Sequence, residues 1–302
     1  MYHGINITMN INRTDRSRNC SVSAVFLFIY LFSTVYNYAI MNQNMVIRNK
    51  KICKINPEGC VPRKKEDEVM KMDKVLLKLS GEALAGDKKH GFDEKTVADV
   101  SRQVKQVLDK GIKVCVVIGG GNFWRGRTSE NMDRVKADSI GMLATVMNCI
   151  YAADSFRNQG IKTHIMTPFV CGNMTELFNK DKAIEYMDAG EVVFFAGGIG
   201  HPYFSTDMAT VLMAVEVGVD VILSAKAIDG VYDSDPKVNP NAIKYDSMQM
   251  SDIVDKKLGV VDLASAVLAM ENKMPMMLFG LNGEDSIVKA VTGGFTGTYV
   301  NV

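Results

Sequence analysis

The chain has 302 residues, of which 47% are hydrophobic and 23% are charged, which is the composition of an ordinary globular protein longer than one average domain. Its 35 basic and 34 acidic residues give a formal net charge of +1, so nothing in the charge balance favours a nucleic-acid surface or a polyanionic partner. The six cysteines include no Cys-x-x-Cys pair and no metal-like spacing, so we expect reduced, buried thiols in a cytosolic protein.

The first 72 residues differ from the rest of the chain. An uncharged stretch reaches from residue 24 to residue 45, but polar residues interrupt it, so it is marginal against the roughly 20 apolar residues that span a bilayer. Three interpretations remain open: a start placed too early, with the true start at Met70 or Met72; a membrane anchor; or a signal peptide. We favour the first and predict an N-terminal extension, residues 1–72, followed by one folded domain, residues 73–302.

From residue 75 onward, the hydrophobic pattern alternates between strand and helix. It predicts, in chain order, a first strand that starts with the apolar run 75–77 and ends in Ser80-Gly81, a helix at 94–110, a strand at 113–118, a helix at 138–158, strands at 162–166 and 191–196, a helix at 206–217, a strand at 221–223, a loop or hairpin at 231–236, helices at 251–257 and 263–272, a strand at 276–279 and a closing edge strand at 296–300. Strand-to-glycine-to-helix transitions recur three times. The pattern therefore predicts an α/β domain.

Two of these strands end in loops suited to phosphate. The first runs into Lys78-Leu79-Ser80-Gly81, and the second runs into Gly119-Gly120-Gly121-Asn122, with Arg125 close behind. Open α/β sheets bind ligands at the carboxyl ends of their strands, where glycine lets backbone N–H groups approach an anion. Neither loop fits the P-loop or the dinucleotide fingerprint, because Trp124 takes the place of the last glycine and Gly-x-x-x-x-Gly-Lys does not occur. The loops therefore indicate phosphate held by separate glycine turns.

Each charged candidate near these loops also has a structural explanation. Lys78, at the end of an apolar strand, either meets an anion or reaches solvent from an edge strand, and the two interpretations weigh about evenly. Arg125 could stack on the single tryptophan or pair with a carboxylate. Asp138 lies four residues after Arg134 and could form a helix-surface ion pair, while Asp207 could simply begin a helix.

Five motifs follow one another along the chain. They are KLSGEAL at 78–84, VIGGGNFWRG at 117–126, GMLATVMN at 141–148, PYFSTD at 202–207, and DGVY at 229–232 followed by Asp235-Pro236. In this order they closely resemble the amino-acid kinase family, in particular its bacterial uridylate kinases, from about residue 75 to the C-terminus. The resemblance implies a three-layer αβα sandwich with a mainly parallel central sheet, and it makes residues 73–302 a catalytic domain.

The same resemblance implies an activity and the residues that carry it. This branch of the family transfers the γ-phosphoryl group of ATP to UMP in pyrimidine nucleotide biosynthesis, yielding UDP, with Mg²⁺ bridging the phosphates. The residues implied as catalytic are Lys78, Arg125 and Asp207. Those implied for ATP are Lys78, Leu79, Ser80, Gly81, Gly121, Arg125, Lys226, Tyr232 and Asp235. Those implied for UMP are Gly120, Asp138, Ile199, Gly200, His201, Pro202, Tyr203, Phe204, Ser205 and Thr206.

Three positions depart from the family pattern. Ile199 and His201 stand where the family usually has Thr and Asn, so a hydroxyl and an amide near the acceptor are replaced. Because a hydrogen-bonding partner is lost, weaker UMP binding is expected rather than abolished chemistry. Lys226 stands where many relatives have Thr or Asn.

The resemblance also implies partners, and it leaves alternatives open. Members of this branch are cytoplasmic homohexamers, often activated by GTP and inhibited by UTP, and we place an effector contact at the loop 86–92. No nucleic-acid partner is expected, and a membrane partner only if residues 24–45 form a real anchor. The alternatives are another phosphotransferase of the family, with a carboxylate or carbamate acceptor, a non-catalytic protein that senses UTP or GTP, and a membrane-tethered signalling module, which would require residues 24–45 to be inserted in a membrane.

Overall fold

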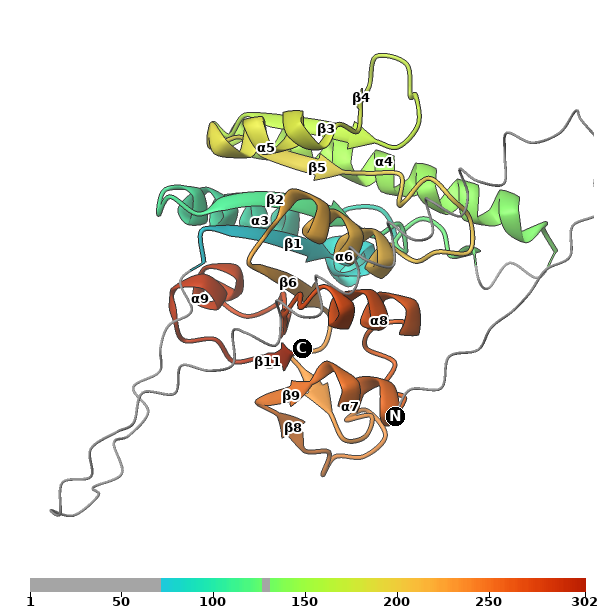
Figure 1. Ribbon diagram of the computed structural model, residues 1–302, viewed down its shortest axis with the longest axis vertical. Helices are drawn as coiled ribbons and strands as arrows, with labels where there is room; N and C mark the ends of the chain where they lie inside the picture. Colours follow the sequence, from blue (N-terminus) through green and yellow to red (C-terminus); the bar gives the residue numbers. More distant parts are fainter. Residues whose placement is uncertain (1–71, 127–130) are drawn as a thin grey trace, which may run out of the picture. The chain divides into compact units, whose positions relative to one another are not determined.

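A nine-stranded sheet forms the centre of the domain. The computed structural model describes residues 72–126 and 131–302, and in them the sheet has the strand order β4-β3-β5-β2-β1-β6-β10-β11-β9 (Figure 1). Its strands are β1 (Lys74–Leu79), β2 (Lys113–Ile118), β3 (Thr163–Thr167), β4 (Glu176–Leu177), β5 (Val192–Phe195), β6 (Val221–Lys226), β9 (Ser247–Gln249), β10 (Met276–Gly280) and β11 (Thr298–Asn301). A separate antiparallel pair joins β7 (Val231–Tyr232) to β8 (Lys244–Tyr245).

Helices cover both faces of the sheet. One face carries α2 (Gly81–Ala85), α3 (Glu94–Leu108), α4 (Arg134–Asn158) and α9 (Ser286–Thr292), with the short helix η1 (Gly86–Lys88) between α2 and α3. The other face carries α5 (Lys180–Asp188), α6 (Thr206–Val217), α7 (Met250–Asp255) and α8 (Leu263–Glu271) (Figure 1). The predicted three-layer αβα sandwich with a mainly parallel sheet is therefore confirmed.

The central strand β1 explains where Lys78 points. Successive side chains of a strand alternate between the two faces of the sheet. Leu77 and Leu79 belong to the core under α3 and α4, whereas Leu76 belongs to the core under α6. Lys78 shares the face of Leu76 and is paired through the backbone with Val117 of β2 on one side and with β6 on the other. The interpretation of Lys78 as an edge-strand lysine that reaches solvent is therefore wrong.

Several predicted elements match the structure closely, and others do not. The strand 113–118 and the helix 206–217 have the predicted bounds, and the segment that follows 230 forms the β7–β8 hairpin. Helix α4 begins four residues earlier than predicted, because the Asp133 side chain accepts the Lys136 N–H and caps it. The strand predicted at 296–300 is present as β11, but its predicted position at the edge of the sheet is wrong. It lies between β10 and β9, because β9 pairs with its outer side.

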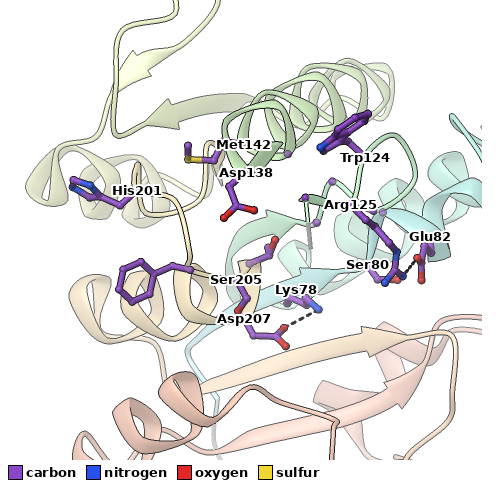
Figure 2. A pocket seen from close by; sticks show the side chains of 18 of the residues that line it. Lys78, Ser80, Glu82, Trp124, Arg125, Asp138, Met142, His201, Ser205 and Asp207 are labelled. Atoms are coloured by element: carbon purple, nitrogen blue, oxygen red, sulfur yellow. Dashed lines mark ion pairs between the residues drawn. The ribbon is translucent and has the colours of Figure 1, made fainter. Parts of the chain in front are cut away.

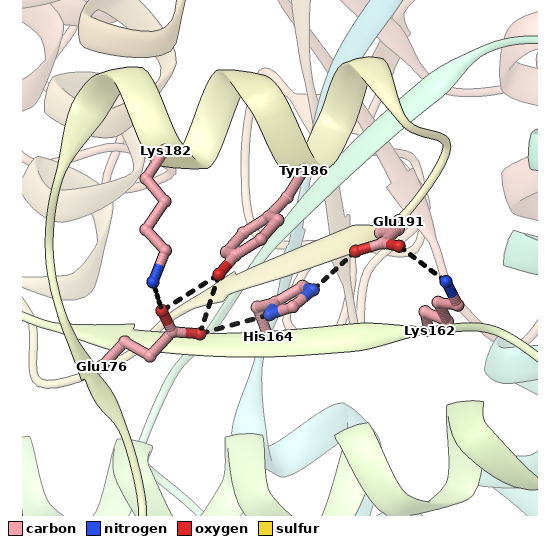
Figure 3. Close-up of polar contacts among 6 residues, drawn as sticks. All are labelled: Lys162, His164, Glu176, Lys182, Tyr186 and Glu191. Atoms are coloured by element: carbon pink, nitrogen blue, oxygen red, sulfur yellow. Dashed lines mark hydrogen bonds and ion pairs between the residues drawn. The ribbon is translucent and has the colours of Figure 1, made fainter.

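The edge of the sheet near β4 is held by a polar network centred on His164. Its Nδ1 lies 3.2 Å from Glu176 and its Nε2 lies 2.7 Å from Glu191, so each ring nitrogen faces a carboxylate (Figure 3). The imidazole also stacks on Tyr186 of α5, with 3.4 Å between the ring centroids. The hydrogen bond from His164, together with the one from Lys162, holds the pKa of Glu191 below its ordinary value against the opposing effect of burial. The network ties β3, β4 and α5 together.

This network predicts a loss of stability in acid. Because the pKa of Glu191 is lower in the folded state, its charge stabilises the fold above the ordinary glutamate pKa, and this contribution disappears as the pH falls through the folded-state value. Glu191→Gln should lower the free energy of unfolding at pH 7 by about 1 kcal/mol and flatten its decline below about pH 5. Urea unfolding at several pH values measures both effects.

The matched control is Glu185→Gln, which neutralises an exposed carboxylate on α5. It should leave the pH dependence of unfolding as it is in the unmodified protein. If unfolding of the Glu191→Gln protein and of the control depends on pH in the same way, Glu191 is not the source of the stability lost in acid.

Candidate functional site

A cavity of about 350 Å³ opens at the carboxyl ends of β1 and β2, between the first turns of α4 and α6 (Figure 2). It is lined by Lys78, Ser80, Gly81, Glu82, Gly119, Gly120, Gly121, Trp124, Arg125, Gly126, Arg134, Asp138, Gly141, Met142, His201, Phe204, Ser205, Thr206 and Asp207. Both glycine loops identified in the sequence thus meet in one cavity, at the sheet edge where α/β folds bind ligands.

The Lys78 ammonium is buried against a carboxylate. Its side chain is 10% exposed, and its Nζ lies 2.9 Å from Asp207 Oδ1 (Figure 2). Asp207 stands in the first turn of α6, whose N-terminus is capped by Ser205 through the Met208 N–H. The Ser205 hydroxyl in turn donates to Asp262, the residue that caps α8. A cation and an anion are therefore fixed side by side in the cavity by secondary structure.

Two glycines of these loops, Gly81 and Gly120, leave no room for a side chain. A Cβ on Gly81 would lie 2.3 Å from Asn122 Oδ1 and 2.4 Å from the Gly119 carbonyl, and a Cβ on Gly120 would lie 2.8 Å from the Gly141 carbonyl. Each contact is closer than real Cβ atoms approach other atoms, so only glycine fits without displacing backbone. The close packing leaves bare backbone at the cavity wall, where N–H groups can reach an anion.

A buried pair of amides joins the two loops to α4. Asn148 donates to the Gly119 carbonyl at 2.7 Å and to Asn122 Oδ1 at 2.7 Å. Asn122 donates in return to Asn148 Oδ1 at 3.0 Å and to the Gly91 carbonyl at 2.8 Å. Both side chains are almost fully buried and satisfied. Hydrogen bonds of the protein itself therefore fix the backbone of the second loop.

A second cation lies at the mouth of the cavity. Arg125 is 60% exposed and forms an ion pair with Glu82 of α2 (Figure 2). The interpretation that Arg125 pairs with a carboxylate is therefore confirmed. Beside it, Trp124 lines the cavity, and its indole N–H is buried with no hydrogen-bond partner among the residues that the structure describes.

Asp138 forms the ion pair expected on the helix surface and also lines the cavity. Its Oδ2 accepts the Arg134 Nε–H at 2.8 Å, which confirms the predicted helix ion pair, and it also accepts the Tyr203 backbone N–H at 2.8 Å. The carboxylate nevertheless projects from α4 into the cavity (Figure 2).

The predicted site residues divide into two groups. Those that line the cavity are Lys78, Ser80, Gly81, Gly120, Gly121, Arg125, Asp138, His201, Phe204, Ser205, Thr206 and Asp207. Those outside its lining are Leu79, whose side chain lies in the core, four residues of the loop before α6, namely Ile199, Gly200, Pro202 and Tyr203, and the more distant Lys226, Tyr232 and Asp235.

The more distant residues have contacts of their own. Lys226 ends β6 and donates to the Val260 carbonyl; burial lowers its pKa to about 8, with Asp207 acting in the opposite direction and Lys78 in the same one. It therefore lies within electrostatic reach of the Lys78–Asp207 pair. The Tyr232 hydroxyl donates to Asp229 at 2.7 Å, and the Asp235 carboxylate accepts a backbone N–H within its own turn.

Seven cavity residues are absent from the sets predicted to be catalytic or to bind ATP or UMP: Glu82, Gly119, Trp124, Gly126, Arg134, Gly141 and Met142. All but Arg134 lie inside the quoted motifs, so their neighbours were the available signal. Arg134 was interpreted only as an ion-pair partner, because a helix-surface pair four residues apart is common.

The described residues also bear on the predictions about metals, thiols and membranes. Within 72–126 and 131–302, no helix is long and apolar enough to cross a membrane; the stretch 24–45 lies outside these ranges. In the same ranges no cluster of three or more His, Cys, Asp or Glu side chains is arranged to hold a metal ion. Cys115 and Cys149 are buried free thiols, and burial raises the pKa of both.

Comparisons with known proteins agree with this geometry. The model of the amino acid kinase family matches residues 73–280. A uridylate kinase from Pediococcus pentosaceus is 43% identical over 234 residues, which are 76% of this chain and 97% of that protein. UMP kinase structures from Bacillus anthracis (34% identity, 76% of this chain, 96% of that one) and Ureaplasma parvum (29%, 77% and 100%) each superpose with a TM-score of 0.73. The chain therefore belongs to the amino acid kinase family and groups there with the uridylate kinases.

Proposed function

We propose that this protein transfers the γ-phosphoryl group of ATP to UMP, giving UDP and ADP. The observation that carries the proposal is the buried Lys78–Asp207 pair, 2.9 Å apart, at the point where two glycine loops meet in one cavity. The similarity to the uridylate kinase of P. pentosaceus supports UMP as the acceptor. In the reaction a UMP phosphate oxygen forms a bond to the γ-phosphorus while the bond from that phosphorus to the β–γ bridging oxygen breaks.

The cavity offers what this transfer needs. Phosphoryl transfer requires aligned reactants and cations placed where negative charge spreads in the transition state. Lys78 is the buried cation, and Arg125 is the cation at the cavity mouth. We assign the ATP phosphates to the loop 78–81 and to Gly121, and the acceptor to Gly120, Asp138 and the loop 199–206.

Asp207 serves two purposes in this proposal. It orients the Lys78 ammonium through their ion pair, and its carboxylate suits Mg²⁺ that arrives with ATP. Protein sites for Mg²⁺ commonly supply one or two carboxylates, and substrate phosphates and water complete the coordination. Asp207 is the carboxylate beside Lys78, and the described residues hold no cluster of three or more potential metal ligands, which fits that pattern. The bound ion would neutralise phosphate charge.

The acceptor loop carries the departures from the family pattern. His201 lines the cavity, whereas Ile199 does not, so of the two positions His201 has the more direct access to an acceptor. Loss of one neutral hydrogen bond is worth about 1 kcal/mol, which corresponds to about fivefold weaker UMP binding. His201→Asn should therefore tighten UMP binding about fivefold. Titration calorimetry on the unmodified protein and the variant measures both affinities, and equal affinities would contradict the expectation.

We further propose that residues 73–302 form a cytoplasmic catalytic domain and that residues 1–72 lie outside it. The family match, which begins at residue 73, supports this division. Expression of residues 70–302 with the activity of the full chain would agree with it, and loss of that activity would contradict it.

We also propose that the protein assembles as a homohexamer. The exposed apolar face of α4 supports assembly: Val135, Leu143 and Met147 are 42%, 52% and 46% exposed. Leu143→Asp should reduce the mass measured by sedimentation, and an unchanged mass would exclude this face as the interface.

We also propose that GTP activates the enzyme and UTP inhibits it, with the loop 86–92 as the candidate contact. Adding each nucleotide to the activity assay tests this proposal.

The acceptor panel is the direct test of the proposed reaction. Full-length protein with ATP and Mg²⁺ should produce UDP from UMP and should leave N-acetylglutamate and carbamate unphosphorylated. A product from either of those acceptors would favour another member of the family. Tight UTP binding without release of ADP would favour a nucleotide sensor.

Removal of the buried cation tests its assigned role. Lys78→Ala should lower kcat by about 10²- to 10³-fold, the scale of one preorganised electrostatic stabiliser. Lys113→Ala is the matched control, because Lys113 lies at the opposite end of the neighbouring strand β2 and pairs with Asp188. Steady-state kinetics on both variants tests the role of Lys78, and Lys113→Ala should keep normal turnover. Near-normal turnover in folded Lys78→Ala protein would show that Lys78 has no part in the mechanism.

A further inference from the structure

Three residues at the acceptor side of the cavity form a closed arrangement of contacts. Asp138 Oδ2 accepts the Arg134 Nε–H and the Tyr203 backbone N–H, each at 2.8 Å. The Arg134 guanidinium lies over the Tyr203 ring, 5.3 Å from its centroid. Each residue of this Arg134–Asp138–Tyr203 cluster therefore contacts the other two. The cluster ties the first turns of α4 to the loop before α6.

The backbone of Tyr203 is held in an unfavourable conformation. Its φ angle is +71°, in the left-handed region that side chains larger than glycine rarely adopt. The residue is also 63% exposed, so burial of its ring offsets little of the cost. Such a conformation persists only where the surrounding contacts determine it, and residues of this kind gather at ligand sites. Within the described part of the chain, two contacts hold Tyr203: its N–H donates to Asp138, and its ring lies beneath the Arg134 guanidinium.

The same contacts fix which carboxylate oxygen faces a ligand. Oδ2 of Asp138 receives both protein donors, and among the described residues no hydrogen bond reaches Oδ1. Oδ1 lies against Gly126, where a Cβ would be only 2.3 Å away, so a side chain at that position would displace it. The Asp138 side chain is 14% exposed and points into the cavity (Figure 2). A carboxylate oxygen in this position can accept hydroxyl groups.

We propose that Arg134 and Tyr203 are positioning residues that hold Asp138 so that its Oδ1 accepts a ribose hydroxyl of the acceptor nucleotide. The inference rests on the proposed function, because it takes the acceptor to be a nucleoside monophosphate. A carboxylate held from two sides needs no reorganisation when the hydroxyl arrives, which lowers the cost of ordering the complex. The cluster then favours a ribose over a sugar that lacks the hydroxyl, because the analogue leaves the carboxylate without that partner.

Arg134→Ala tests the proposal through the identity of the acceptor. With UMP, kcat/KM should fall about tenfold, the scale of one charge-assisted hydrogen bond, while the KM for ATP stays unchanged. With the analogue of UMP that lacks the accepted hydroxyl, either the 2′-deoxy or the 3′-deoxy compound, the same substitution should cost less than about twofold, because the interaction is already absent. Tyr203→Ala, which removes the ring and keeps the N–H, should show the same pattern with a smaller loss.

Lys136→Ala is the matched control, because it removes an exposed cation from the same turn of α4 without touching Asp138. Its kinetics should equal those of the unmodified protein with every acceptor. Equal losses for UMP and both deoxy analogues in Arg134→Ala would show a general structural role and overturn the proposal, as would unchanged kinetics with UMP.

Calorimetric binding of the same three nucleotides separates this proposal from the proposed function. If the unmodified protein binds UMP without turning it over, the proposed function fails. The cluster is then judged by binding alone: Arg134→Ala should weaken UMP more than the analogue that lacks the accepted hydroxyl. Absence of UMP binding to the unmodified protein would overturn both.

Discussion

The burial of the Lys78 ammonium on a central strand is the constraint on which the rest of the site depends. A cation in that position is costly unless an anion meets it, and removing one partner of a buried pair typically costs about 3–5 kcal/mol. Asp207 meets it at 2.9 Å only because α6 begins at the carboxyl edge of the sheet. Ser205 caps that helix and is held by Asp262 at the start of α8, so the position of the carboxylate depends on two helices.

The glycine loops complete the site by close packing. Where a Cβ would collide with backbone at Gly81 and Gly120, the chain brings two strand ends and α4 closer together than side chains would allow. The buried amides Asn122 and Asn148 then satisfy the polar groups that this packing encloses. The protein's own packing and hydrogen bonds therefore shape the cavity, with cations on two sides and bare backbone between them. This preorganisation suits a reaction that is catalysed mainly by alignment and charge.

The sequence predicts those parts of the fold and site that local pattern determines. The predicted bounds of strand β2 and helix α6 are confirmed, because the ends of an apolar run and a helix cap are visible in the local sequence. The position of β11 was predicted wrongly, because pairing with β9 is a long-range choice that its own residues do not reveal. For the same reason the pattern left Lys78 undecided between edge and centre. The contacts of Arg134 and the left-handed backbone of Tyr203 belong to the folded state, so no motif could reveal them.

A double-mutant cycle on kcat tests most directly whether Lys78 and Asp207 act as one unit. The single variants Lys78→Ala and Asp207→Ala and the double variant are compared with the unmodified protein in the conversion of UMP to UDP. If the pair acts together, as its 2.9 Å contact predicts, the double variant should be about as slow as the slower single variant. If the two losses instead multiply, the residues act independently, and the account of a site organised around their ion pair is wrong.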